Sequence, residues 1–312
     1  MQVIEFICPL CQGPLRRESE AYVCARDQRS YPVTLGIPDF RVCPDQLVQP
    51  DTEQALVARL LAEYPNRSFA ELVDLDRSLR PAVPSSLTAR RRVHIEGGVV
   101  RAKSSLAEIH RLGALPAQGQ FLEIGCGTGG FLVAAADMFR TVVGLDVSLP
   151  RLVLAKKQLE ETGRQAIVIS ACAESLPFSD KSFHLVVGSD VIEHVEDPVQ
   201  VMREAYRVLV PGGAIFLATP NRWSLTPEPH VNVWGLDSCQ RHGVNAMSRW
   251  CRMFPIGISA CSTGSKFDDC SVKHGLAGGK SSFPHSPLNT LHDCRPGPAP
   301  PCRSIMHSKT TP

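Results

Sequence analysis

The sequence lacks the features that mark membrane, secreted and nucleic-acid-binding proteins. None of its apolar runs approaches the roughly 18 residues that cross a bilayer, and the first residues, MQVIEF, carry no basic segment of a signal peptide. Basic and acidic residues nearly balance, at 33 against 31, and no basic patch with interleaved aromatic residues is evident. We therefore expect a soluble, cytoplasmic protein with no membrane span and no strong attraction to nucleic acid.

The cysteines are numerous, with 12 in 312 residues. In a short secreted chain such a number would suggest disulfides, but without a signal segment reduced thiols are the better expectation. Near the N-terminus, Cys8, Cys11 and Cys24 provide three thiolates on two knuckles, which is how a tetrahedral zinc site begins. Asp27 stands where a fourth cysteine is expected, and its harder oxygen ligand predicts a weaker site. The alternative is a metal-free module that folds through its strands.

The pattern along the chain predicts four segments. A zinc-ribbon-like module covers residues 1–45, a helical linker 46–94, a main domain 95–235 and an atypical tail 236–312. From residue 120 the main domain alternates short apolar strands with helices, which predicts βαβ units on a doubly wound, mostly parallel sheet of the α/β class.

A glycine-rich turn, LEIGCGTGG at 122–130, joins the first of these strands to the next helix. Its glycines let the backbone approach a ligand beside the positive end of the helix. They also satisfy the dinucleotide pattern GxGxxG, and Asp146 ends the second strand at the distance expected for a ribose ligand, so the glycines alone do not choose between cofactors. Glu123 favours S-adenosylmethionine over NAD, because a carboxylate here repels a pyrophosphate and attracts the ammonium of a methionine moiety.

Several of these segments resemble a known family. LEIGCGTG, VVGLDVS, ESLPFSDKSF, SDVIEHVEDP and LVPGGAIFLATPN are similar to the class I S-adenosylmethionine-dependent methyltransferases of the quinone-biosynthesis-like type (methyltransferase type 11). The resemblance covers about residues 95–235 and implies a Rossmann-like fold with S-adenosyl-L-methionine as cofactor. The residues that it implies line the methionine part of the cofactor are Glu123, Gly125, Gly127 and Gly129.

The same resemblance implies an adenosine side of the site. Asp146 binds the ribose hydroxyls, Val147 packs on the adenine, and Cys172 and Ala173 flank the adenine edge. Many relatives have an aspartate in place of Cys172, whose carboxylate accepts a hydrogen bond from the adenine amino group. Because a thiol is a weaker acceptor, either the affinity is lower here or backbone contacts suffice.

The segment SDVIEH follows the fourth strand, and open α/β sheets bind ligands at the carboxyl ends of their strands. Asp190, Glu193 and His194 are therefore the candidate catalytic residues, with His194 as the general base. The alternative is that Glu193 and His194 only brace the next helix, whose start is marked by Asp197 and Pro198. In some relatives such residues bind a divalent ion, but one Glu–His pair is a weak metal signal.

The loop after the fifth strand, 219–235, is rich in proline, tryptophan and histidine, as an acceptor-binding loop could be. Its candidate wall residues are Asn221, Arg222, His230 and Trp234. The alternative is a packed crossover loop.

The tail after about residue 236 has scattered cysteine, glycine and proline and no sustained period, which predicts a segment without a stable fold. We expect no central strand from it, and therefore an incomplete sheet. A shift of one base after Gly235 can give GFLPAAWRE in place of residues 237–245, and relatives often continue WGxGFLP, so a frameshift is one hypothesis. A native tail without a fold is the other.

The module's CPLC and YPVTLGIPDF resemble the small zinc-ribbon proteins that partner tRNA and release-factor methyltransferases, and CPLC is also similar to the zinc finger of rRNA guanine methyltransferases. The leading interpretation is an enzyme that methylates a small molecule and carries a ribbon-like module at one end, with S-adenosyl-L-methionine as cofactor and a structural zinc ion as the open second candidate. An RNA methyltransferase is one alternative, disfavoured by the near-neutral charge. The other is an inactive cofactor-binding or partner-docking protein with an incomplete sheet.

Overall fold

The computed structural model describes residues 4–42, 49–80, 92–113, 119–219, 258–262 and 271–274. Its main sheet has the strand order β11-β10-β9-β8-β5-β6-β7. The five parallel strands are β5 (Gln120–Ile124), β6 (Thr141–Asp146), β7 (Ile167–Ser170), β8 (Phe183–Ser189) and β9 (Leu209–Ala218). The strand order reverses direction at β5, which confirms the predicted doubly wound α/β fold.

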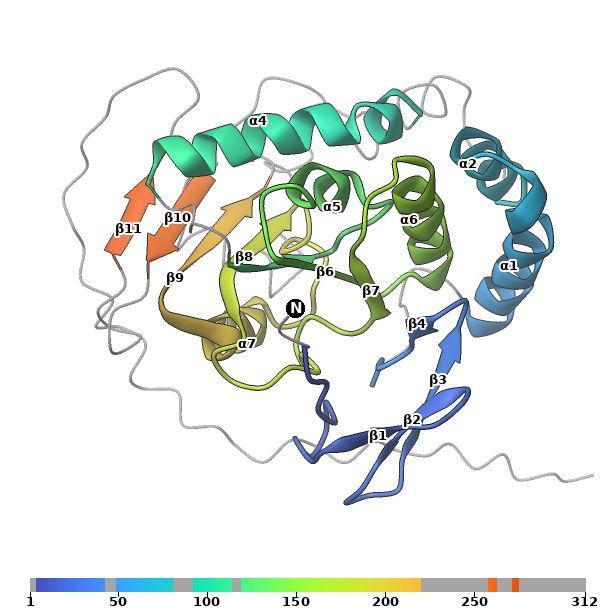
Figure 1. The fold of residues 1–312 in the computed structure, drawn as a ribbon, viewed down its shortest axis with the longest axis horizontal. Helices are drawn as coiled ribbons and strands as arrows, with labels where there is room; N and C mark the ends of the chain where they lie inside the picture. The colour runs from blue at the N-terminus through green and yellow to red at the C-terminus, as the bar shows by residue number, and fades with distance from the viewer. Residues whose placement is uncertain are drawn as a thin grey trace, which may run out of the picture. The chain divides into compact units, whose positions relative to one another are not determined.

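Helices follow the strands as the sequence pattern predicts (Figure 1). They are α1 (Pro50–Glu63), α2 (Phe69–Ser78), α4 (Gly98–Arg111), α5 (Gly130–Ala135), α6 (Leu149–Glu161) and α7 (Pro198–Val208), with a short 3-10 turn at Tyr64–Asn66. Local signals set several starts: Ser68 and Glu71 form a capping box on α2, and Asp197 caps α7 before a proline at the first helical position.

The two faces of the sheet have separate cores, because successive residues of a strand point to opposite faces. On the first face, Phe121 and Leu185 pack with residues of α1, α2, α4, α5 and α6. On the second face, Leu122, Val143 and Val186 pack with residues of α7 and of the N-terminal segment. Strand residues are apolar on both sides, as buried parallel strands require.

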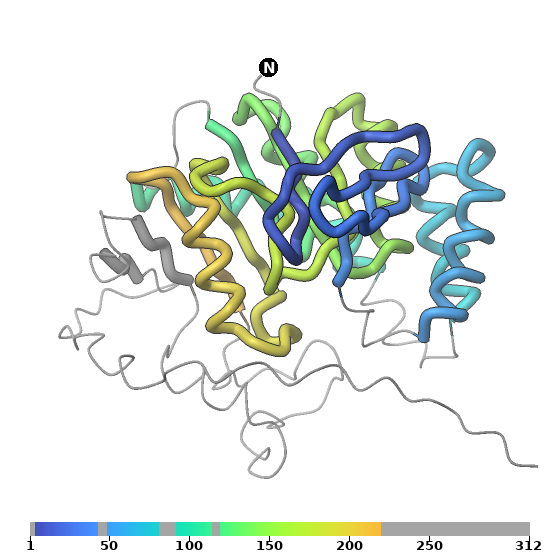
Figure 2. The backbone as a smooth tube through the Cα atoms, turned by 90° about the horizontal axis from the view of Figure 1, so that it is seen from below, coloured from blue at the N-terminus to red at the C-terminus, as the bar shows by residue number. Residues whose placement is uncertain are grey.

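The N-terminal segment forms a small antiparallel sheet of β1 (Leu15–Arg17), β2 (Ala21–Cys24), β3 (Ser30–Thr34) and β4 (Ile37–Pro38). We call residues 4–42 the cysteine module. Figure 2 shows it beside α7 on the second face of the main sheet. Phe40 is fully buried there, and the backbone N–H of Phe40 donates to the carbonyl of Ser170 at 2.7 Å. The module thus occupies a place that a helix fills in the usual doubly wound arrangement, and it meets the edge strand β7.

The tail contributes two described strands, β10 (Ile258–Ser262) and β11 (Ser271–His274), which differs from the expected incomplete sheet. β10 pairs antiparallel with β9, and β11 pairs antiparallel with β10. Backbone pairing needs no particular side chain, and antiparallel strands are not required to be apolar throughout, so the low apolar density of the tail did not reveal them. The rest of the tail, and with it the frameshift hypothesis, lies outside the described residues, as do the candidate wall residues Asn221, Arg222, His230 and Trp234.

Among the described residues, no helix is both long and apolar enough to cross a membrane. The cytoplasmic location stays a prediction. The division of the chain at residues 45, 94 and 235 also stays a prediction. The described residues all belong to one compact unit, Met1–Ala277.

Candidate cofactor site and cysteine cluster

The glycine turn has the backbone geometry that its sequence predicts. Gly125, Gly127 and Gly129 adopt φ values of 74°, 52° and 85°, a region that residues with a side chain rarely enter. A Cβ atom on Gly125 would lie 2.7 Å from Cγ2 of Val191, whereas a Cβ on Gly127 would meet no atom within 4 Å. The turn therefore packs closely on one side and leaves open space beside Gly127, where a ligand can approach the backbone.

Asp146 lies beside this turn at the end of β6. Its Oδ2 accepts a hydrogen bond from the N–H of Gly127 at 2.9 Å, and its Oδ1 accepts one from the N–H of Ser148 at 2.8 Å. These bonds fix the carboxylate against the glycine turn. Val147, the next residue, is partly exposed, so its side chain is accessible to a ligand.

Glu123 is the most unusual group of the site. It is only 5% exposed, and its Oε2 atom is buried without a hydrogen-bond partner among the described residues. Burial, assisted by the charge of Asp146, raises the pKa of Glu123 well above its ordinary value. A buried acceptor without a partner is costly, and a cationic group placed beside it would satisfy it. The residues therefore fit the ammonium group of a methionine moiety.

Cys172 and Ala173 follow the neighbouring strand β7 and are buried. The N–H of Ala171 donates to the carbonyl of Asp146 at 3.2 Å, which ties the ends of β6 and β7 together. The structure thus brings the predicted methionine-side and adenosine-side residues to the same carboxyl edge of the sheet, while their contacts with a cofactor stay predictions.

The predicted catalytic turn, residues 190–194, lies next to the glycine turn through the contact of Val191 with Gly125. Asp190 has a left-handed backbone with φ 52°, held by its N–H bond to the carbonyl of Ala218 at 2.8 Å. Asp190 and His194 are exposed. Glu193 accepts a hydrogen bond from Oγ1 of Thr219 at 3.3 Å, so it spans the ends of β8 and β9.

Asp197 serves as the N-cap of α7, since its Oδ1 accepts from the N–H groups of Val199 and Gln200, both at 3.0 Å. This capping role does not depend on Glu193 or His194. The catalytic assignment of Asp190, Glu193 and His194 stays a prediction.

Arg101 on α4 is a neighbour of this turn that sequence reasoning missed. Partial burial lowers the pKa of its guanidinium, and the charge of Asp190 opposes that shift. A positive group that acts on Asp190 from a preceding helix has no motif in the sequence, because its position depends on how α4 packs on α5.

The four predicted metal ligands form one cluster. The ligand atoms of Cys8, Cys11, Cys24 and Asp27 all lie within 4.8 Å of one another. Sγ of Cys11 is 3.4 Å from Sγ of Cys24, and Sγ of Cys8 is 3.6 Å from Oδ2 of Asp27. Ligands on a tetrahedral zinc ion with bonds of about 2.3 Å lie about 3.8 Å apart, so the donor set fits that ion. The N–H of Arg26 also points to Sγ of Cys24 at 3.4 Å, an outer contact that supports a thiolate.

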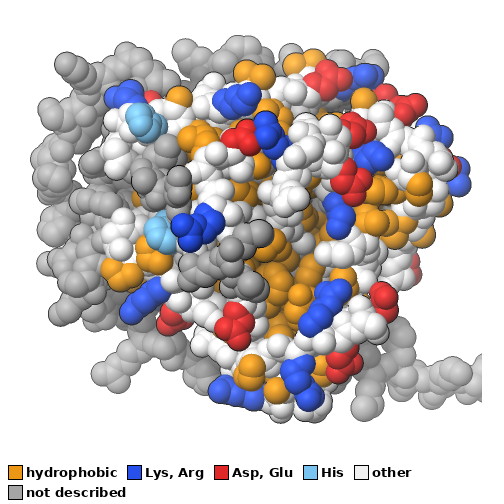
Figure 3. All heavy atoms as spheres, viewed as in Figure 1, with side chains coloured by type: hydrophobic (Ala, Val, Ile, Leu, Met, Phe, Trp, Pro, Cys, Tyr) orange, Lys and Arg blue, Asp and Glu red, His pale blue; other side chains and the backbone are white. Residues whose placement is uncertain are grey.

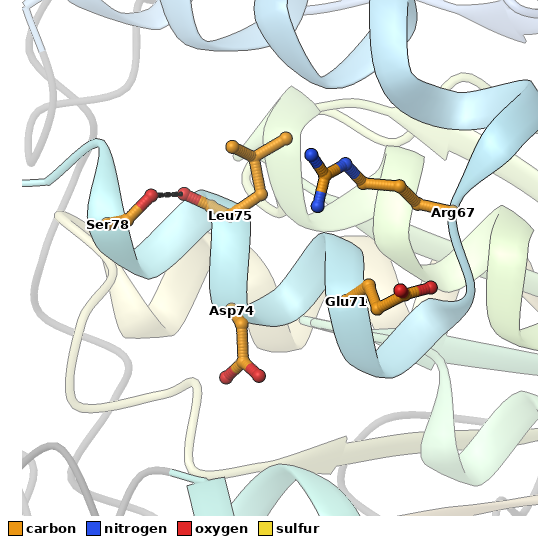
Figure 4. Close-up of a pocket in the computed structure, with 5 residues that line it drawn as sticks. All are labelled: Arg67, Glu71, Asp74, Leu75 and Ser78. Atoms are coloured by element: carbon orange, nitrogen blue, oxygen red, sulfur yellow. Dashed lines mark hydrogen bonds between the residues drawn. The ribbon is translucent and has the colours of Figure 1, made fainter.

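A surface hollow lies elsewhere, on α2, lined by Arg67, Glu71, Asp74, Leu75 and Ser78. Figure 4 shows Asp74 pointing away from Arg67 and Leu75, and the hydroxyl of Ser78 bonded to the carbonyl of Leu75. Arg67 pairs with Glu63 and Asp74 with Arg77. No set of polar groups converges there, so the carboxyl edge of the main sheet is the better candidate site.

The sheet order, the glycine turn and the acidic residues Glu123 and Asp146 lie in a stretch of the chain that is similar to known methyltransferases. Residues 122–217 match the family model described as "Methyltransferase domain". Among curated proteins, 105 residues are 37% identical to the ubiquinone biosynthesis O-methyltransferase of Pseudomonas putida, over 32% of this chain and 44% of that protein. The same-named protein of Pseudomonas fluorescens is 35% identical over the same shares. The match therefore spans less than half the length of these relatives.

Solved structures of similar proteins also match parts of the chain. The YcgJ protein of Bacillus subtilis is 25% identical, with a TM-score of 0.37, over 44% of this chain and 64% of that one. An S-adenosylmethionine-dependent methyltransferase of Mesorhizobium loti is 28% identical, with a TM-score of 0.33, over 37% of this chain and 54% of that one.

Proposed function

We propose that this chain binds S-adenosylmethionine at the carboxyl edge of its main sheet and transfers the methyl group to a small-molecule acceptor. The observation that carries the proposal is the buried carboxylate of Glu123, which has an unsatisfied oxygen beside an open glycine turn. A nicotinamide dinucleotide would bring its pyrophosphate to this turn, and Glu123 in its ionised form would repel it. A methionine moiety instead brings an ammonium and a sulfonium.

Each part of the site then has a role. Glu123, Gly125, Gly127 and Gly129 hold the methionine side, and Asp146, Val147, Cys172 and Ala173 hold the adenosine side. The bound cofactor supplies an electrophilic methyl group whose transfer is already favourable, so the protein mainly aligns the acceptor. His194, exposed in the turn between β8 and α7, accepts the proton that the acceptor loses. Asp190 and Glu193 orient the acceptor beside it.

The names of the curated relatives support a proposal for the class of methyl acceptor. The curated relatives are named O-methyltransferases of ubiquinone biosynthesis. A hydroxyl group on a small molecule is therefore the first acceptor chemistry to test. On the face seen in Figure 3, basic and acidic side chains are interspersed rather than gathered by sign, which gives an RNA acceptor no support there.

Calorimetric titration tests the cofactor. We expect saturable binding of S-adenosylmethionine and none of NAD by the full chain. Asp146→Ala should abolish the binding, because it removes the ribose ligand and releases the N–H groups of Gly127 and Ser148. The matched control is Arg140→Ala, an exposed residue just before the start of β6. Binding of NAD in place of the methyl donor would overturn the proposal.

Methyl transfer with a true acceptor tests the base. His194→Ala should lower kcat and remove the rise of kcat with pH, with little change in the affinity for the methyl donor. Intact turnover in that variant would assign the residue to bracing α7.

We also propose a structural zinc ion on Cys8, Cys11, Cys24 and Asp27, supported by the close grouping of their ligand atoms. The test is metal analysis of the purified full chain. One zinc per chain, lost in Cys11→Ser, supports the site. The absence of zinc from a folded protein that has been offered the ion would remove it.

A further inference from the structure

A buried guanidinium links the cysteine module to the candidate cofactor site. Arg41 follows β4, and its side chain is only 14% exposed. Its Nη1 donates to the carbonyl of Val147 at 3.0 Å and to Oε2 of Glu53 at 2.8 Å. Its Nε and Nη2 donate to the carboxylate of Asp39 at 2.9 and 2.6 Å. Arg41 therefore joins three parts of the chain: the module, α1 and the loop after β6.

The two carboxylates around Arg41 reach the main sheet themselves. Oε1 of Glu53 accepts a hydrogen bond from the N–H of Leu149 at 3.3 Å, so the loop after β6 is held at two points. Asp39 forms an isolated parallel bridge with Ser170, the last residue of β7. The network thus holds the ends of both β6 and β7, where the ribose and adenine ligands are assigned.

The network keeps its charge in spite of burial. Burial acts to lower the pKa of the Arg41 guanidinium, but the hydrogen bonds and charges of Asp39 and Glu53 outweigh it and raise the pKa. A buried ion network contributes less to stability than its contacts suggest, because each charge loses its hydration. Its effect here is geometric, since a planar guanidinium fixes the direction of the Val147 carbonyl.

The direction of that carbonyl matters to the cofactor site. Val147 directly follows Asp146, whose Oδ1 accepts from the N–H of Ser148 in the same loop. A rotation of the peptide after Val147 would move that N–H and with it the carboxylate of Asp146. The module also supports the next loop, because Oγ of Ser175 donates to the carbonyl of Pro9.

We propose that Arg41, with Glu53, is a positioning residue for the adenosine half of the cofactor site, so that the cysteine module is part of this site. This inference rests on the proposed function. It predicts that variants of Arg41 lose affinity for the adenosine half of the ligand and leave the methionine half unaffected.

The experiment measures the affinity of the full chain for two probes by calorimetry. S-adenosylhomocysteine carries both halves, and 5′-methylthioadenosine carries the adenosine half without the amino acid. We expect Arg41→Lys and Arg41→Met to weaken both probes by the same factor, on the order of tenfold for the loss of one charged hydrogen bond. Glu123→Gln should weaken only S-adenosylhomocysteine.

The matched control is Lys157→Met. Nζ of Lys157 donates to the carbonyl of Tyr64 at 3.1 Å, so this variant loosens the contact between the end of α1 and α6 without touching the loop after β6. Equal loss of affinity in Lys157→Met, or wild-type affinity in both Arg41 variants, would overturn the inference and leave Arg41 as a structural residue.

Binding by the wild-type chain separates this inference from the proposed function. If the wild-type chain binds neither probe, the proposed function fails and this inference fails with it. If Arg41→Met does not fold, Arg41→Lys and Glu53→Gln carry the test. Glu53→Gln keeps an amide oxygen as an acceptor but removes the negative charge. It is expected to lower the affinity for both probes less than Arg41→Met does.

Discussion

The two faces of the main sheet are covered by different kinds of structure. Five described helices cover the first face: α1, α2 and α4 to α6. Among the described residues, the second face is covered by one helix, α7, and by the cysteine module, whose Tyr31 and Phe40 pack with Val143 and Ile169. A segment that looks like an appendage in the sequence is thus part of the core.

This difference changes what the module is expected to do. A detachable ribbon would recruit a partner and leave the fold of the main domain unaffected. A ribbon that covers one face of the sheet folds as part of the same unit. Its folding, and metal binding at its proposed site, should therefore affect both the stability of the whole unit and the loops at the cofactor site. The following predictions test this comparison in order of decreasing effect.

The largest expected effect is loss of the aromatic anchor on either face. Phe40 lies 5.1 to 5.4 Å from the rings of Phe6, Tyr22 and Tyr31, and Phe121 lies 5.0 Å from Phe139 on the first face. We expect Phe40→Ala and Phe121→Ala to lower the free energy of unfolding by similar amounts, about 3–5 kcal/mol.

The measurement is urea unfolding, followed by far-UV circular dichroism of the full chain. Leu10→Ala is the control, because Leu10 is 49% exposed and its loss should have little effect. If the module were detachable, Phe40→Ala would leave the main unfolding transition in place, and the comparison between the faces would fail.

The sequence predicted the elements on both faces much better than the contacts between distant segments. The β5 to β9 strands and their helices follow from local periodicity, and the cysteine cluster follows from spacing. The docking of Phe40 on Ser170 and the reach of Arg41 to Val147 join residues more than a hundred positions apart, and no local pattern encodes such pairing. β10 was missed for a similar reason, because its place depends on the backbone of β9 and not on its own composition.

Arg207 on α7 tests the other part of the second face. Its guanidinium donates to both oxygens of Glu204, to Asp180 and to the carbonyls of Leu176 and Phe178. We expect Arg207→Met to destabilise the chain by about 3 kcal/mol, since it leaves the buried Glu204 without its charged partner. Restored stability in Arg207→Met combined with Glu204→Met, measured by the same urea unfolding, would confirm that the unpaired charge is the cause. Additive losses would contradict it.

Metal removal tests whether the cysteine module and the main domain unfold together. With zinc at about a hundred times its Kd, binding adds about 2.7 kcal/mol to the free energy of unfolding. A chelator should therefore lower the Tm of the wild-type chain and leave the Tm of Cys11→Ser unchanged. The main domain should melt together with the module in both cases. A chelator effect confined to a separate, earlier transition would show that the module unfolds alone.

A change that is smaller per pH unit is expected from the pH dependence of stability that Glu123 contributes. Its pKa is raised in the folded chain, so between the ordinary value of 4.5 and the raised value the folded state binds more protons than the unfolded state. Stability should then fall as pH rises through this window, by at most about 1.4 kcal/mol per pH unit for one proton. Glu123→Gln should remove this part of the slope in urea unfolding measured between about pH 5 and pH 8. An unchanged slope would mean that Glu123 is ionised throughout.

The smallest effect on the free energy of unfolding is expected from the loss of a helix cap, and one cap on each face allows a comparison. Oδ1 of Asp197 accepts from two N–H groups of α7, whereas Oγ of Ser68 accepts from one N–H group of α2 within its capping box. Each cap replaced by alanine should cost about 1 kcal/mol in urea unfolding. Because α7 is the one described helix on the second face and α2 lies at the outside of the first, we expect Asp197→Ala to cost more than Ser68→Ala. It should also disturb the catalytic turn just before it, which amide hydrogen exchange of residues 190–196 would detect as faster opening. Equal costs and unchanged exchange would mean that packing of Val201 and Ala205, and not the cap, holds α7 on the sheet.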